Sequence, residues 1–78
     1  MNSAHEVDRL ARAFIAHLRH NLSFDELHLI DQGYEAPPAL IYAAFLDTFN
    51  RMPDHDEDSM LIGVAWQTAR RMGFLPVH

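Results

Sequence analysis

The two most apolar stretches of the chain are ALIYAAFLDTFNRM, residues 39–52, and MLIGVAWQTARRM, residues 60–72. On a helical wheel, one half of the first cylinder carries apolar side chains and one threonine: Leu40, Ile41, Ala44, Phe45, Thr48, Phe49 and Met52. Tyr42 and Leu46 widen this face. A surface helix usually buries an apolar stripe only somewhat wider than about 100°. We therefore expect these helices either to be wrapped tightly or to offer apolar surface to a partner.

The second stretch has a similarly wide apolar face. Its main stripe is expected to consist of Leu61, Val64, Ala65, Thr68 and Met72. Ile62, Trp66 and Ala69 extend the stripe around one side, where Gly63 lies next to Trp66. Trp66 is the single tryptophan, and the pattern fits a core residue and a contact residue equally well.

Helix start and stop signals divide the chain into four helices, at residues 4–21, 24–32, 38–52 and 56–72. Ser3 with Glu6, and Ser23 with Glu26, have the spacing of capping boxes. Gly33 suits a left-handed helix end, and Pro37-Pro38 can open the third helix. The signals predict a compact all-α four-helix domain; the alternative for residues 27–30 is a short strand.

Proline, glycine and charged residues also predict the helix ends and turns in the second half of the chain. Pro53 is expected to stop the third helix, and Asp47 to pair with Arg51 across one turn. Gly73 and Phe74 are expected to form a closing turn with an apolar contact. Short connections then join the helices into one domain over residues 1–78.

Length and charge limit the functional classes. The chain has 78 residues, no cysteine, eleven acidic residues, six arginines and no lysine, for a net charge of −5. The acidic balance argues against nucleic acid, whose binding depends on cationic side chains, and no apolar run is long enough for a membrane span. We expect a cytoplasmic protein with a protein partner, and no enzyme or cofactor, because a bundle of this size rarely has room for a catalytic cleft.

The acidic segment Asp54-His55-Asp56-Glu57-Asp58 begins like a calcium loop. The sixth and twelfth positions of such a loop would be Ser59 and Ala65, where glycine and glutamate are required. The segment is better explained as the first turn of a helix, where carboxylates meet the positive end of the helix dipole.

Three histidines are weak metal candidates. His17 and His20 lie one turn apart, and a helix hairpin could bring them near Asp25 and His28. Three imidazoles and a carboxylate would suit zinc. The wheel places His20 toward solvent, so a solvated role is the stronger interpretation.

Together these features favour a small acidic protein-interaction module, an inhibitor or adaptor, and the wide apolar faces predict a homo-oligomer. The expected contact surface combines apolar residues with acids that select a basic partner: Tyr42, Leu46, Phe49, Ile62, Trp66, Asp54, Asp56, Glu57 and Asp58. The alternatives are a metal- or small-ligand-binding helical module and a helix-turn-helix-like regulator.

Overall fold

The computed structural model describes residues 4–76, which form four helices. They are α1 (Ala4–Asn21), α2 (Phe24–Asp31), α3 (Pro38–Phe49) and α4 (His55–Met72), and no strand occurs among these residues. The predicted all-α four-helix domain is therefore confirmed, and the strand alternative for residues 27–30 is wrong. The predicted cap Ser3 lies outside the described residues.

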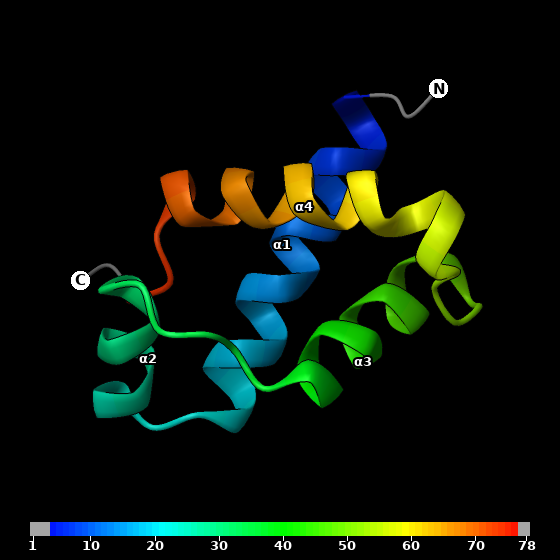
Figure 1. Ribbon diagram of the computed structural model, residues 1–78. Helices are drawn as coiled ribbons and strands as arrows, with labels where there is room; N and C mark the ends of the chain where they lie inside the picture. The colour runs from blue at the N-terminus through cyan, green and yellow to red at the C-terminus, as the bar shows by residue number, and fades with distance from the viewer. Residues whose placement is uncertain (1–3, 77–78) are drawn as a thin grey trace.

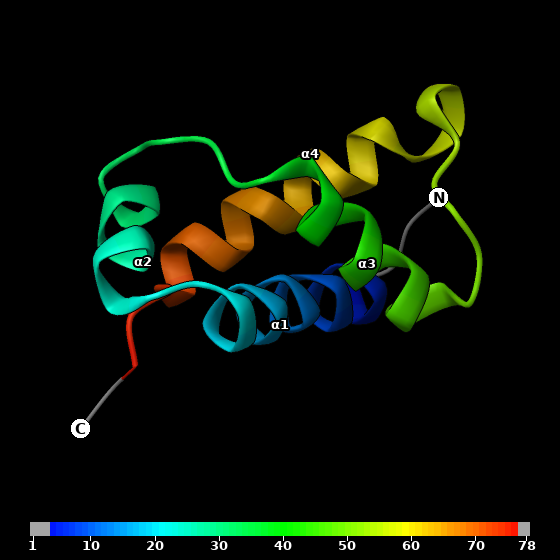
Figure 2. The same ribbon diagram turned by 90° about the horizontal axis from the view of Figure 1, so that it is seen from below.

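The helices assemble around α1. Both α3 and α4 pack extensively on α1, whereas α2 contacts it only near one end (Figure 1). Seen from below, α1 forms one layer and α3 and α4 lie together on the same side of it (Figure 2). The described part of the chain measures 34 × 22 × 19 Å.

The buried face of α1 follows the predicted helical spacing. Its core residues are Leu10, Ala11, Phe14, Ile15 and Leu18, with Val7 and Leu22 half-buried beside them. The opposite face carries the exposed residues Arg9, Arg12, Ala16, Arg19 and His20, as expected. Periodicity alone therefore identified the surface of α1 on which the domain is built.

Local signals set both ends of α2. The Ser23 hydroxyl accepts a hydrogen bond from the Glu26 N–H at 3.2 Å, and the Ser23 N–H donates to the Glu26 carboxylate at 2.9 Å. The bond from the Ser23 N–H, followed by the Ser23 hydroxyl, lowers the pKa of the Glu26 carboxyl. At the other end Gly33 has a φ of 115°, and the N–H of Tyr34 returns to the Leu29 carbonyl. The predicted capping box and glycine-terminated end are both confirmed.

Helix α3 ends three residues earlier than predicted. Asn50 adopts the left-handed conformation, with φ 57° and ψ 34°, and its N–H donates to the Leu46 carbonyl at 2.7 Å. Asparagine tolerates this conformation better than most residues, so the helix stops before Pro53 is reached. As a result Arg51 lies outside the helix, and the predicted pair between Asp47 and Arg51 is wrong. Asp47 instead faces His17 of α1 at 3.5 Å.

Helix α4 begins one residue earlier than predicted and is rotated about its axis. Asp54 is its N-cap and accepts hydrogen bonds from the N–H groups of Asp56 and Glu57. The buried stripe is Asp58, Leu61, Ala65 and Ala69, whereas Val64 and Met72 of the expected stripe are exposed. The rotation brings the larger Trp66 ring against the core, and burying an aromatic ring removes more apolar surface from water than burying valine.

The C-terminal turn closes the core as predicted. Gly73 has a φ of 90°, and Phe74 is fully buried after it. The Arg19 guanidinium donates to the carbonyl oxygens of Phe74 at 2.8 Å and Leu75 at 2.9 Å. These charge-assisted bonds tie Phe74 and Leu75 to α1 and keep the Phe74 ring in place.

Candidate partner-binding groove

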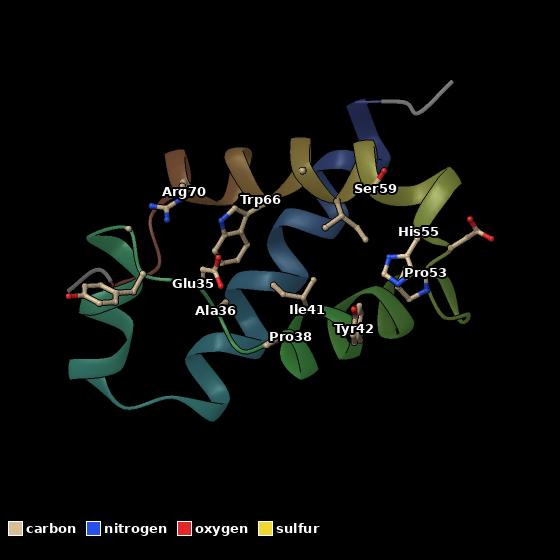
Figure 3. A pocket seen from close by; sticks show the side chains of 15 residues that line it. Glu35, Ala36, Pro38, Ile41, Tyr42, Pro53, His55, Ser59, Trp66 and Arg70 are labelled. Carbon is tan, nitrogen blue, oxygen red and sulfur yellow. The ribbon is translucent and has the colours of Figure 1, made fainter.

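A groove of about 460 Å³ lies between α3, α4 and the segment that connects α2 to α3. Helices α3 and α4 both rest on α1 but make few contacts with each other, which leaves this space between them (Figure 3). Most of the lining is apolar and comes from Ala36, Pro38, Ile41, Tyr42, Pro53, Ile62, Gly63 and Trp66. Polar side chains, among them Glu35, Asp54, His55 and Arg70, border it.

Trp66 belongs to both the core and the groove. Its ring meets Phe14 edge to face, with centroids 5.7 Å apart, and lies 5.1 Å from Phe74. The Arg70 guanidinium stands 5.9 Å from the same ring, within the range of a cation–π contact. The residue is half-buried and also lines the groove. Trp66 thus packs against the core and also lines the groove; its role as a contact residue stays a prediction.

An internal ion pair holds the connection between α3 and α4. Arg51 donates two hydrogen bonds to the Asp58 carboxylate, at 2.7 and 3.0 Å, and the Asp54 N–H donates a third at 2.7 Å. The Asp58 side chain is only 7% exposed. The Arg51 hydrogen bonds, followed by the bond from the Asp54 N–H, lower the pKa of Asp58 to about 2. The Arg51 guanidinium also lies 5.1 Å from the Phe45 ring.

This pair corrects the role expected for Asp58. The sequence placed Asp58 on an acidic surface that selects a partner, but the structure buries its carboxylate and engages it within the chain. A buried carboxylate with an arginine partner is not free to bind a second cation. Asp54, Asp56 and Glu57 remain exposed, and Asp54 borders the groove.

The predicted apolar contact residues separate into two groups. Tyr42, Ile62 and Trp66 line the groove together. Leu46 is exposed outside it, and Phe49 packs on Phe45 with centroids 4.8 Å apart. Only three of the five apolar residues therefore share one concave surface.

Comparisons with protein-family models, curated proteins and solved structures found no match. The chemistry of the groove must therefore be judged from its own residues. Apolar walls with an exposed aromatic ring can take up apolar side chains, and carboxylates at the borders can attract cationic groups.

The structure adds groove residues that the sequence analysis did not include among the contacts. The connecting segment supplies Tyr34, Glu35 and Ala36, and α4 supplies Gly63. The available signal was Gly63, because glycine weakens an otherwise regular helix and so suggests a packing or functional reason for its presence. No pattern in the sequence predicted that residues 33–36 would border the same space.

The histidines do not assemble. Within residues 4–76 no three histidine, aspartate or glutamate side chains form a group that could hold a metal ion. His17 faces Asp47, His20 is exposed, and His28 stacks on Phe24 with centroids 6.4 Å apart.

The described helices also include none with the length and apolar character needed to cross a bilayer.

Proposed function

We propose that the protein is an interaction module that binds an apolar segment of a partner protein in the groove between α3 and α4. The observation that carries the proposal is an apolar groove, lined by Tyr42, Ile62 and Trp66, that no other part of the described chain covers. Aromatic residues in partly desolvated pockets are typical anchors of protein interfaces. An inhibitor or adaptor would use such a groove to recognise one protein and exclude others.

Charge supports a protein partner with basic groups. The chain has a net charge of −5, and Glu35 and Asp54 border the groove while Asp56 and Glu57 are exposed beside it. Complementary charge steers association and suppresses wrong partners. A basic, partly apolar protein segment could pack its apolar side chains on the walls of the groove and pair its cationic groups with the carboxylates at the borders.

The helix-turn-helix alternative receives no support from this arrangement. Residues 32–37 separate α2 from α3, whereas that motif joins its helices by a turn of about three to four residues. The start of α3 also contributes Pro38 to the groove and is therefore part of the proposed contact surface.

Replacing Tyr42 with aspartate is expected to weaken partner binding by about tenfold or more, which corresponds to about 1.4 kcal/mol. Tyr42 is 38% exposed, so the substitution places a charge in the groove without emptying the core. The experiment selects binders from a library of random displayed peptides and measures their affinity by the fluorescence of Trp66, the single tryptophan.

Leu46→Asp is the matched control. Leu46 is one turn further along α3 and 43% exposed, but it does not line the groove. Selected peptides should bind the Leu46 variant as they bind the unchanged protein. If no peptide is enriched, or if the enriched peptides bind both variants equally well, the groove is not the binding site and the proposal is wrong.

A further inference from the structure

Gly63 has no role in the fold that explains a glycine. It is exposed within α4, and a Cβ atom added to it would meet nothing within 4 Å. Its φ is not in the left-handed region, in contrast to Gly33 and Gly73. Glycine inside a helix destabilises the helix relative to alanine, because it loses more backbone freedom on folding. Glycine thus lowers the stability of α4 at a position that borders the groove.

From this position we infer that the occupant of the groove is an α-helix of the partner, which crosses α4 at Gly63 and carries lysine or arginine at the end that faces Asp54. The inference rests on the proposed function and names the partner's form. A missing side chain allows another backbone to come close, and small residues at a helix crossing have this effect. A helix would complete the layer that α3 and α4 begin on α1 (Figure 3).

The length of the groove fits a short helix. Its α4 wall extends from Ser59 to Arg70, which at about 1.5 Å per residue spans roughly 16 Å. About three turns of a partner helix match this span. Apolar residues at positions i, i+3 or i+4, and i+7 of that helix would face Ile41, Ile62 and Trp66, as in other complexes in which a helix lies in a groove.

The charges of the borders indicate what flanks the apolar face. Asp54 borders the groove at the start of α4, with Asp56 and Glu57 exposed next to it, and Glu35 lies near Trp66 and Arg70 at the opposite end. The Arg70 guanidinium is placed over the Trp66 ring. Carboxylates at the Asp54 end favour a helix with a cationic flank there, whereas Glu35 and Arg70 carry opposite charges at the other end. A second copy of a chain of net charge −5 is a poorer electrostatic match.

The test compares Gly63→Ala and Gly63→Leu with the control Gln67→Leu. Gln67 is exposed on α4 and does not line the groove. Gly63→Ala should raise the melting temperature by about 4–8 °C, because alanine favours the helix. The same substitution should weaken binding of a selected helical peptide by about tenfold, and Gly63→Leu should abolish it. Gln67→Leu should leave binding unchanged.

The probes are two displayed libraries of 16-residue peptides, one with an alanine-rich helical framework and one fully random. Enrichment of helical peptides with lysine or arginine at one end, and loss of their binding in both Gly63 variants, supports the inference. Extended or acid-flanked peptides that depend on Tyr42 but bind the Gly63 variants normally would overturn it and leave the proposed function intact. Binders that ignore Tyr42 and Gly63 would overturn both.

Light scattering tests whether a second copy of the chain occupies the groove. A molar mass well above 9.0 kDa that falls to the monomer value in Gly63→Leu would identify a second copy in the groove and overturn the basic partner helix. A monomer both in the unchanged protein and in Gly63→Leu, together with binding of the basic helical peptide to the unchanged protein, supports the basic partner helix.

Discussion

Replacing Phe14 with alanine is expected to lower the free energy of unfolding by about 3–5 kcal/mol. Phe14 is fully buried on α1, the helix on which α3 and α4 both pack, and its ring supports Trp66 edge to face. The substitution leaves a cavity under the groove as well as in the core. A domain of this length has a total stability on the order of 4–12 kcal/mol, so much of it would be lost.

Equilibrium unfolding in urea, followed by far-ultraviolet circular dichroism, measures this loss. The control is Phe24→Ala, because Phe24 is 59% exposed at the start of α2 and outside the core. Its expected change is within about 0.5 kcal/mol, as for most surface substitutions. A loss below about 1 kcal/mol in Phe14→Ala would show that the packing between Phe14 and Trp66 does not hold the domain together.

The second large effect is expected from Asp58→Asn. The amide cannot replace the charged acceptor of Arg51, and it leaves the arginine without its partner at the connection between α3 and α4. The melting temperature should fall by several degrees. The groove should also change, because the same pair fixes the end at which α3 and α4 converge. Asp56→Asn is the control: Asp56 is an exposed acid in the same turn.

The effect of Asp58 has a definite pH dependence. Its pKa is lowered from 3.8 to about 2 in the folded protein, so the folded state favours the ionised carboxylate. The stabilisation is therefore present above about pH 4 and is lost as the pH falls toward 2. The difference in melting temperature between the unchanged protein and Asp58→Asn should shrink over this interval. A difference that stays constant would contradict the role of the ion pair.

Features of the fold that depend on residues close together in the sequence could be predicted, and features that depend on competing or distant residues could not. The caps at Ser23 and Gly33 were predicted because each involves atoms only a few residues apart. The end of α3 was misplaced because two signals competed, and the left-handed Asn50 acts before Pro53. The Asp47–Arg51 pair was wrong for the same reason: once the helix ends at Phe49, Arg51 no longer lies one turn from Asp47.

The candidate site was predicted in composition and not in shape. Tyr42, Ile62 and Trp66 were expected on a contact surface and do line one groove, whereas Leu46 and Phe49 lie outside it. A helical wheel shows which residues share a face, but it has no information on which neighbour covers that face. The burial of Asp58 depended on Arg51 of another segment, so the acidic pattern of residues 54–58 could not reveal it.

The amino-acid sequence by itself determined the number of helices, the caps of α2 and the buried face of α1, because periodicity and capping depend on interactions within about one helical turn. Tertiary structure alone decided the rotation of α4, the burial of Asp58 against Arg51 and the groove between α3 and α4. These features depend on how side chains of separate helices interlock on α1, and that fit is a property of the assembled domain and not of any one helix.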